Sequence, residues 1–184
     1  MSEVITPGRV GGRRAYNGRV ISVDVDEVRF PDGSLGSLEM VRHPGASAVV
    51  PLLDGTKSDP TVLLIRQYRY AAEGFIYEVP AGRLDPGESP AHCAARELRE
   101  ETGYEAAELS HIYTMYTTPG FTDEKIHLFL ATGLRAGEAH REPDEFMELS
   151  PMPLSRAMAM VQSGEIQDAK TALALFHTAV FHAK

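Results

Sequence analysis

The sequence predicts an α/β fold: a mixed β-sheet sandwiched between helices, preceded by a small β module at the N-terminus. Three observations favour this class. Apolar residues alternate or run together over strand-length segments up to residue 80, and again between residues 112 and 149. One helical segment with clear end signals interrupts these strands, and helical periodicity fills the chain from residue 154 onward. Helices on both faces of a sheet are a common result of this order.

Length and composition limit the function. The 184 residues, 43% hydrophobic and 24% charged, are typical of a globular protein with a substantial core. The net charge of -8 argues against broad binding to nucleic acid or anionic membrane, and the apolar runs are too short to span a bilayer. The N-terminus lacks the apolar core of a secretory signal. Cys93 is the only cysteine, so no intrachain disulfide is possible and a reducing cytoplasm is the simplest compartment. We therefore expect a cytoplasmic protein that binds a small molecule and neither nucleic acid nor membrane.

The N-terminal β module is predicted over residues 1–43. Residues 17–30 alternate as strands, residues 31–34 (Pro-Asp-Gly-Ser) are a strong turn signal, and residues 35–43 form another extended stretch. The Gly-Gly-Arg-Arg run at residues 11–14 is interpreted as a mobile basic arm. Because about three strands alone are barely self-supporting, we expect the module to depend on a partner surface.

The main domain is predicted over residues 44–184. Its strands are expected at residues 47–53, 61–70, 75–79, 112–117, 125–132 and 145–149. Two helices follow, one over residues 154–163 that Gly164 ends and one over residues 167–182. The apolar face of the last helix is expected to consist of Ala172, Leu175, Phe176, Ala179 and Val180.

The helix with the clearest ends is predicted over residues 90–102. Ser89 is a good N-cap, Pro90 suits the first helical position, and Gly103 suits the C-terminal stop. An apolar stripe of Ala91, Ala94, Ala95 and Leu98 is expected to dock on the core, and Cys93 to be a small structural residue. Glutamates project from a neighbouring face: Glu97, Glu100 and Glu101.

These three glutamates predict a bound cation. Carboxylates at i, i+3 and i+4 repel one another, and glutamate near a helix C-terminus opposes the helix dipole. Carboxylate oxygens suit Mg²⁺, with Mn²⁺ as a possible substitute. Arg96, one turn before Glu100, is interpreted as an orienting ion-pair partner, while Gly82 and Gly87 let the preceding loop approach a metal or phosphate. The seven histidines show no metal-ligand spacing, so we expect no structural zinc.

The full motif identifies a family. It consists of Gly82, five residues, Glu88, seven residues, and then Arg96-Glu97-Leu98-any-Glu100-Glu101-any-Gly103-Tyr104. This pattern resembles the complete Nudix box. The resemblance implies a Nudix-type α/β/α sandwich from about residue 40 to the end and metal-dependent hydrolysis of a pyrophosphate bond. It also implies that Glu97, Glu101, Glu100 and the carbonyl of Ala81 hold the metal, and that Glu88 braces the loop against the helix.

Other segments resemble the ADP-ribose pyrophosphatase branch of that family. Pro119 stands fifteen residues after Tyr104, where this branch carries a proline, and residues 67–69, 78–82 and 118–124 are also similar to it. The resemblance implies that ADP-ribose is cleaved to AMP and ribose 5-phosphate by a homodimer whose N-terminal strands complete the partner's site. The substrate-binding residues that it implies are Arg69, Arg42 or its neighbour His43, Pro119 and Glu78.

The loop before the last predicted strand is expected to supply the general base. Glu142, Asp144 and Glu145 lie close together there, and Glu145 fits the family pattern best. The catalytic candidates are thus Glu145, Glu100 and Arg96.

Several alternatives remain open. Because the chain has no tryptophan, stacking of adenine would fall to Tyr16, Phe30 or another tyrosine. Rival functions are a pyrophosphatase for nucleotide sugars or dinucleoside polyphosphates and a sensor that binds ADP-ribose without hydrolysing it.

Overall fold

The computed structural model describes residues 6–55, 57–139 and 146–182. The described residues form two compact units. The first contains the residues up to Gly45 together with Tyr116–Lys125, and the second contains Ala46–Met115 and the residues from Ile126 onward. No sequence pattern suggested that residues 116–125 would pack with the N-terminal strands. Each unit is described by itself below.

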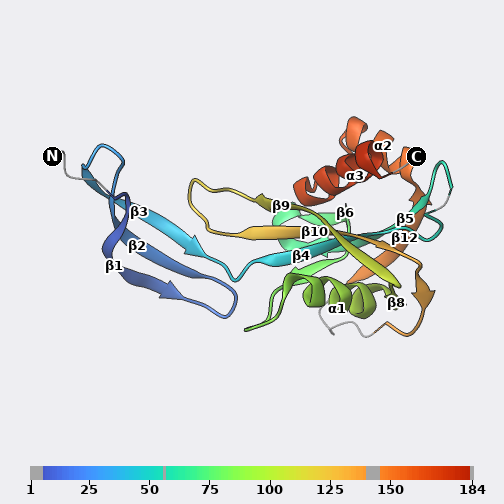
Figure 1. The fold of residues 1–184 in the computed structure, drawn as a ribbon, viewed down its shortest axis with the longest axis horizontal. Helices are drawn as coiled ribbons and strands as arrows, with labels where there is room; N and C mark the ends of the chain where they lie inside the picture. The colour runs from blue at the N-terminus through green and yellow to red at the C-terminus, as the bar shows by residue number, and fades with distance from the viewer. Residues whose placement is uncertain (1–5, 56, 140–145, 183–184) are drawn as a thin grey trace. The chain divides into compact units, whose positions relative to one another are not determined.

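The first unit is an antiparallel sheet of three strands (Figure 1). The strands are β1 (Gly8–Asn17), β2 (Ser22–Arg29) and β3 (Leu35–Arg42), in the order β1-β2-β3. The Tyr116–Lys125 segment attaches to β3, since the Val41 N–H donates to the Phe121 carbonyl at 2.7 Å and the Asp123 N–H donates to the Val41 carbonyl at 3.3 Å. This unit exposes large apolar side chains, including Val10, Tyr16 and Leu35.

The expectation of a mobile basic arm at residues 11–14 was wrong. These residues lie within β1, where Gly12 pairs with Asp26 and Arg14 with Asp24 in the register with β2. The physical reason is charge pairing across the strands: Arg14 forms an ion pair with Asp24, and Arg9 with Asp26 at 2.8 Å. Both aspartates are largely buried, so the arginines supply the partners that a buried carboxylate needs.

The second unit is built on two sheets. One has the order β7-β4-β10-β9, from β7 (Ala81–Arg83), β4 (Ala46–Pro51), β10 (Lys125–Thr132) and β9 (Glu108–Tyr116). The other has the order β12-β5-β6, from β12 (Met147–Pro153), β5 (Thr61–Arg69) and β6 (Gly74–Glu78), and a one-turn 3-10 helix (Tyr70–Ala72) joins β5 to β6. Strands β4 and β10 are parallel, and β4 and β7 are antiparallel, so the sheet is mixed as expected. A short pair, β8 (Tyr104–Glu105) and β11 (Arg135–Ala136), completes the strands.

The last strand is longer than predicted. It was expected to end at residue 149, but β12 continues through Pro151 to Pro153. Strand β12 lies at the edge of its sheet and pairs with β5 alone in the strand order. Proline lacks a donor and is tolerated at a sheet edge, which explains the difference.

In the described part of the chain, three α-helices cover the sheets: α1 (Pro90–Thr102), α2 (Leu154–Ser163) and α3 (Ala169–Phe181). Figure 1 shows α1 on one side of the strands of this unit and α2 with α3 on the other. The larger apolar core, which includes Leu64, Leu128 and Leu175, contacts α2 and α3, and a smaller core around Val49, Leu98 and Phe129 lies under α1. The expected α/β/α sandwich is therefore confirmed. Within the described residues, every helix is too short or too polar to cross a lipid bilayer.

The ends of α1 agree with the prediction. Ser89 Oγ accepts the His92 N–H, Pro90 begins the helix, and Gly103 ends it in the left-handed conformation with φ 77°. The face that α1 buries was only partly predicted. Ala91 and Ala95 are exposed, while the buried positions are Cys93, Ala94, Glu97, Leu98, Glu101 and Thr102. The pattern failed because it assigned the carboxylates to a face away from the core.

The buried face of α3 also differs from the prediction. Phe176 and Val180 are exposed, whereas Thr171 and Thr178 are fully buried beside Ala174 and Leu175. The two threonines can be buried because their hydroxyls are hydrogen-bonded: Thr171 Oγ1 donates to Asp168 at 2.6 Å, and Thr178 Oγ1 donates to the Ala174 carbonyl at 2.8 Å.

Candidate active site

Two buried carboxylates of α1 lie against the backbone of β7. Glu101, 2% exposed, accepts the Ala81 N–H through Oε2 at 3.1 Å. Glu97, 8% exposed, lies beside Gly82, where an added Cβ would come within 1.8 Å of Glu97 Oε1. Position 82 must therefore be glycine for Glu97 to hold this place. The sequence predicted that Gly82 lets the loop approach a metal or phosphate, and the carboxylate of Glu97 lies in the space that a Cβ at this position would fill.

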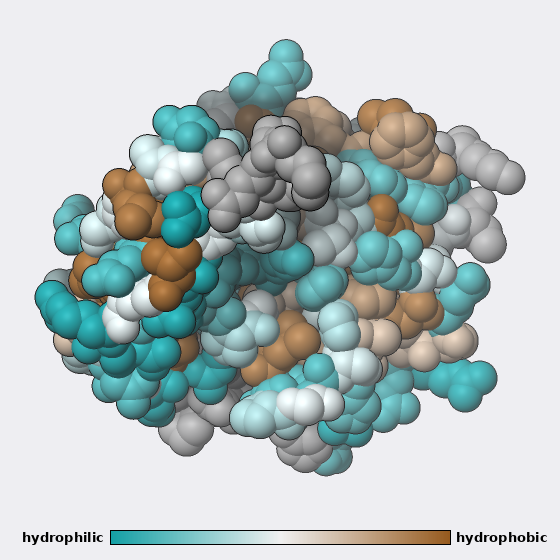
Figure 2. All heavy atoms as spheres, turned by 60° about the vertical axis from the view of Figure 1, so that its left-hand side comes forward, coloured by the Kyte–Doolittle hydropathy of each residue, from teal (hydrophilic) through white to brown (hydrophobic). Residues whose placement is uncertain are grey.

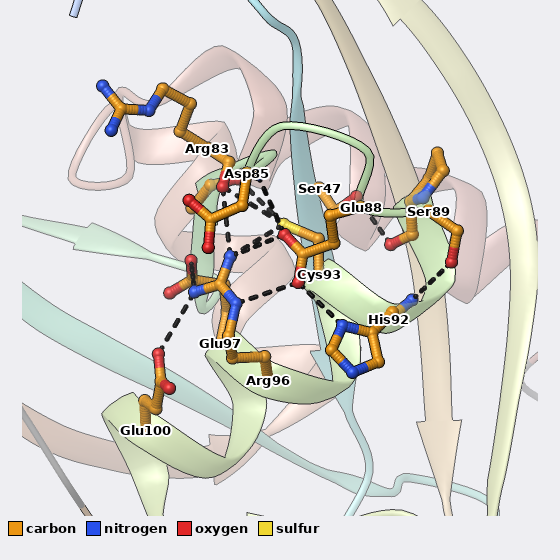
Figure 3. Close-up of polar contacts among 12 residues, drawn as sticks. Ser47, Arg83, Asp85, Glu88, Ser89, His92, Cys93, Arg96, Glu97 and Glu100 are labelled. Carbon is orange, nitrogen blue, oxygen red and sulfur yellow. Dashed lines mark hydrogen bonds and ion pairs between the residues drawn. The ribbon is translucent and has the colours of Figure 1, made fainter.

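Arg96 joins the glutamates of the box (Figure 3). Its Nη1 donates to Glu97 Oε1 at 2.6 Å and to Glu100 Oε2 at 3.1 Å. Its Nε and Nη2 donate to Glu88 at 3.0 and 2.9 Å, and Nη2 also donates to the Arg83 carbonyl at 3.1 Å. The hydrogen bonds to Glu88, opposed by burial and helped by the charge of Glu97, raise the pKa of Arg96. The predicted ion pair of Arg96 with Glu100 is present and is one part of a larger cluster.

Glu88 braces the loop against α1, as expected. Besides Arg96, its carboxylate accepts the Asp85 N–H at 3.1 Å and lies 2.8 Å from His92 Nδ1. The hydrogen bonds from Arg96 hold the pKa of Glu88 well below its usual value, although burial acts in the opposite direction. The loop of residues 83–88 is thus tied to the helix at a side chain that stays charged.

Cys93 fills the space between the helix and β7. Its Sγ lies 3.4 Å from the Gly82 carbonyl and 3.5 Å from the Arg83 carbonyl, and the side chain is fully buried. Burial, with the nearby charge of Glu97, raises the pKa of this thiol to about 11. These observations agree with a structural role.

The donor atoms at this place suit a hard divalent cation. Glu97 and Glu101 present carboxylates next to Ala81 and Gly82, and Glu100 is attached to the same arginine as Glu97. Across the described residues, no three or more histidine, cysteine, aspartate or glutamate side chains already surround a common cation position. The Glu100 side chain, 34% exposed against 11% for Glu97, is the member of the set with most freedom to change its rotamer. The residue types fit Mg²⁺.

Arg69 and Glu78, both predicted to bind substrate, contact each other. Arg69 Nη2 donates to Glu78 Oε2 at 2.6 Å, and Arg69 Nε donates to the same carboxylate at 3.1 Å. Burial lowers the pKa of Arg69, but the hydrogen bond and charge of Glu78, with smaller contributions from the charges of Glu101 and Asp168, raise it overall. Arg69 therefore lies within electrostatic reach of the Glu101 carboxylate.

A third member of this group was missed by the sequence analysis. Lys170 of α3 places Nζ 3.2 Å from Glu78 Oε1 and 3.0 Å from Asp168 Oδ2. The only local signal was Asp168, which is the N-cap of α3. Nothing in the periodicity of α3 relates its first turn to β6, so the contact could not be found from the pattern.

Two other predicted substrate contacts lie in the first unit. The Arg42 guanidinium bonds three carboxylates there: Asp24 at 3.2 Å, Asp123 at 3.1 Å, and Asp26. Its neighbour His43 donates its N–H to Asp123 at 2.9 Å. Pro119 is exposed in the turn before Phe121.

The general-base candidates Glu142, Asp144 and Glu145 lie outside the described residues. The residue that follows them, Phe146, accepts the Tyr68 N–H at 3.0 Å through its carbonyl. The chain is therefore attached to the end of β5 directly after Glu145.

Comparisons with known proteins agree with this geometry. The chain matches the NUDIX domain family over residues 42–175. It is 42% identical over 168 residues to an ADP-ribose pyrophosphatase of Bacillus subtilis (strain 168), covering 90% of this chain and 89% of that protein. It is 39% identical over 159 residues to a GDP-mannose pyrophosphatase of Salmonella paratyphi B, covering 78% of this chain and 82% of the relative. A solved structure of an ADP compounds hydrolase has a TM-score of 0.80 and covers 97% of this chain and 95% of its own, at 23% identity, which supports the fold. The chain therefore belongs to the Nudix family and is a Nudix pyrophosphohydrolase.

Proposed function

We propose that this enzyme hydrolyses the pyrophosphate bond of ADP-ribose to AMP and ribose 5-phosphate with Mg²⁺ as its cofactor and Mn²⁺ as a possible substitute. The observation that carries the metal assignment is the pair of buried carboxylates, Glu97 and Glu101, against Ala81 and Gly82. The similarity to an ADP-ribose pyrophosphatase over 90% of the chain supports the substrate. Glu97, Glu101, Glu100 and the Ala81 carbonyl would hold the cation.

Several residues of the chain have distinct roles in the proposed hydrolysis. A divalent cation bound at these residues would polarise the phosphoryl oxygens and lower the pKa of the attacking water. Arg96 orients Glu97 and Glu100, and Arg69 contacts the diphosphate oxygens, for which a planar guanidinium is well suited. Glu145 takes the proton as the water oxygen bonds to phosphorus and the bridging P–O bond breaks. Arg42 and Pro119 belong to the proposed substrate-binding set, and Glu78 contributes to it through its hydrogen bonds with Arg69.

Glu97→Gln and Glu101→Gln test the metal assignment. Each variant should lose most of kcat while circular dichroism shows an unchanged fold, because the amide keeps the shape and removes the charge. Glu165→Gln, at an exposed position after α2, is the matched control. Turnover is measured across a Mg²⁺ titration and again in excess chelator. Full activity in chelator would remove the metal from the mechanism.

The base is tested with Glu145→Gln and Glu142→Gln. Loss of a positioned general base lowers kcat by roughly 10²- to 10⁴-fold with little change in substrate affinity, and Glu145→Gln should behave in this way. Glu142→Gln should cost much less. A near-normal Glu145→Gln beside an inactive Glu142→Gln reverses the assignment.

A nucleotide-sugar substrate is the alternative that a specific observation favours, since a GDP-mannose pyrophosphatase is 39% identical to this chain. A panel of ADP-ribose, GDP-mannose and dinucleoside polyphosphates, ranked by kcat/KM at fixed Mg²⁺, decides between them. ADP-ribose is expected to rank first. A higher rank for GDP-mannose would replace the proposed substrate, and binding of ADP-ribose without turnover of any compound would indicate a sensor.

We also propose that the enzyme is a homodimer in which the N-terminal strands contribute to the interface. The support is the three-stranded sheet, which is small for an independent fold and exposes large apolar side chains. Figure 2 shows hydrophobic residues among hydrophilic ones on the face that it draws. Sedimentation of the full chain, and of a chain that starts at Pro44, tests this assignment. A fully active monomer from the shortened chain would contradict it.

A further inference from the structure

Glu78 is held between two cations from different elements of the second unit. Its carboxylate, 4% exposed, accepts from Arg69 of β5 on both oxygens, from Nη2 on Oε2 at 2.6 Å and from Nε on Oε1 at 3.2 Å. Lys170 of α3 places Nζ 3.2 Å from the same Oε1. Lys170 is itself largely buried, with 13% of its side chain exposed, whereas Arg69 is 41% exposed. Arg69 is therefore the exposed cation of this group, and Lys170 is the buried one.

The position of Lys170 is unfavourable for the helix that carries it. Lys170 is the second residue of α3, and a positive side chain near a helix N-terminus opposes the helix dipole. Burying an ammonium group adds a desolvation cost. Helix stability does not explain this lysine. Its contacts with Glu78 and Asp168 explain this lysine, and they indicate that its charge acts on the Glu78 carboxylate at the end of β6.

The packing of α3 on β6 does not rest on Lys170. The Val79 N–H donates to Thr171 Oγ1 at 2.9 Å, and Thr171 Oγ1 donates in turn to Asp168 Oδ2 at 2.6 Å. Asp168 also caps the helix through the Thr171 N–H. These bonds would remain if Lys170 lost its charge, so the charge and the packing can be tested separately.

The charged groups around Arg69 determine how strongly it can attract an anionic ligand. A lone Glu78 would neutralise Arg69, because the carboxylate takes up the guanidinium edge that carries Nε and Nη2. Lys170 pairs with both Glu78 and Asp168, so the charges of Arg69, Lys170, Glu78 and Asp168 balance. Without Lys170 the remaining three groups would carry one net negative charge beside the Arg69 guanidinium. Arg69 is the most exposed of these groups, and its pKa also responds to the charge of Glu101.

We propose that Lys170 is a positioning residue for the diphosphate. By balancing the carboxylates of Glu78 and Asp168, it prevents a net negative charge beside the Arg69 guanidinium, which would contact the diphosphate. This inference rests on the proposed role of Arg69 in diphosphate binding and deepens it by naming the residue that sets its charge.

The test compares Lys170→Met, Lys170→Arg and the control Lys57→Met in the full chain. Lys57 is also paired with an aspartate, Asp54 at 2.7 Å, but is 67% exposed. KM and kcat are measured with ADP-ribose, and dissociation constants are measured by calorimetry with α,β-methylene ADP-ribose and with inorganic pyrophosphate. Lys170→Met should raise KM and both dissociation constants about tenfold, which is the effect of about 1.4 kcal/mol, and change kcat much less. Lys170→Arg should restore most of the affinity, and Lys57→Met should change nothing.

A double variant separates charge from packing. In Glu78→Gln/Lys170→Met the amide can still accept from Arg69 but no longer neutralises it, so affinity should recover relative to Lys170→Met alone. Unchanged affinity in Lys170→Met, or a double variant as weak as the single one, would overturn the proposal. Binding of pyrophosphate is measured so that this test does not depend on which substrate the enzyme prefers. If the enzyme prefers GDP-mannose, and Lys170→Met still raises the dissociation constant of pyrophosphate, the proposed function fails while this proposal holds. A wild-type enzyme that does not bind pyrophosphate fails both.

Discussion

Each unit contains one arginine shared among three carboxylates, and the two clusters differ in their balance of charge. Arg42 of the first unit pairs with Asp24, Asp26 and Asp123. Two of these aspartates have further arginine partners, Arg14 for Asp24 and Arg9 for Asp26. The sheet therefore matches three carboxylates with three guanidinium groups.

In the second unit, Arg96 is divided among Glu88, Glu97 and Glu100. A fourth carboxylate, Glu101, receives a backbone N–H on the same side of the helix. A balanced cluster satisfies its own charges and stabilises a fold, whereas an acidic excess of this kind attracts a cation. The two clusters have a similar number of carboxylates and differ in the number of arginines that pair with them.

The largest expected difference between the clusters is catalytic. Glu97→Gln should lower kcat by roughly 10²- to 10³-fold, the usual cost of losing one electrostatic stabiliser. Asp26→Asn, which removes an equally buried charge from the sheet, should leave kcat within a few-fold of the wild type if it folds. Steady-state kinetics at saturating Mg²⁺ on both variants measure this. Equal losses would mean that the charge balance carries no information about function.

The next effect concerns stability. Arg96→Met should reduce the free energy of unfolding by about 1.5–3 kcal/mol, the usual range for hydrogen bonds to charged groups. Arg42→Met should cost less, because Asp24 and Asp26 keep Arg14 and Arg9. Urea unfolding followed by circular dichroism gives both values. A greater loss for Arg42→Met would contradict the comparison.

The pH dependence of stability tests the contribution of Glu88 to its cluster. Its pKa is lowered in the folded protein, chiefly by hydrogen bonds from Arg96. A carboxylate of this kind contributes stability above its ordinary pKa of about 4.3, and the contribution disappears as the pH falls through the folded pKa. The difference in unfolding free energy between wild type and Glu88→Gln should therefore be constant from pH 7 to pH 5 and shrink below it. A difference that does not depend on pH would show that Glu88 acts by shape alone.

The smallest effect is expected at the edge of the balanced cluster. Arg14, with 48% of its side chain exposed, forms the type of ion pair that contributes about 1 kcal/mol or less. Arg14→Gln should change the unfolding free energy by no more than that amount and leave kcat/KM unchanged. High salt should reduce even this difference, and a loss of activity would place Arg14 in the site.

Local signals explain what the sequence could predict. The ends of α1 follow from Ser89, Pro90 and Gly103, and the end of α2 from Gly164, because caps depend only on neighbouring residues. Arg96 was correctly paired with Glu100 because i, i+4 spacing is a property of the helix itself.

The features that the sequence did not predict depend on distant partners. The basic run at residues 11–14 became a strand because Asp24 and Asp26 lie opposite it. Glu97 and Glu101 turned inward because β7 supplies a glycine and an N–H at their positions. Lys170 contacts Glu78, which lies on a strand that the periodicity of α3 cannot relate to this helix.

The position of Cys93 gives this protein a built-in reporter of local opening. An alkylating reagent reaches Sγ only when α1 separates from the Gly82 and Arg83 carbonyls. With a pKa of about 11, on the order of one thiol in 10⁴ is ionised at pH 7 in the closed state, so labelling there is slow. Since the chain has no other cysteine, the rate at which Cys93 is modified reports how often α1 separates from β7. No engineered probe is needed.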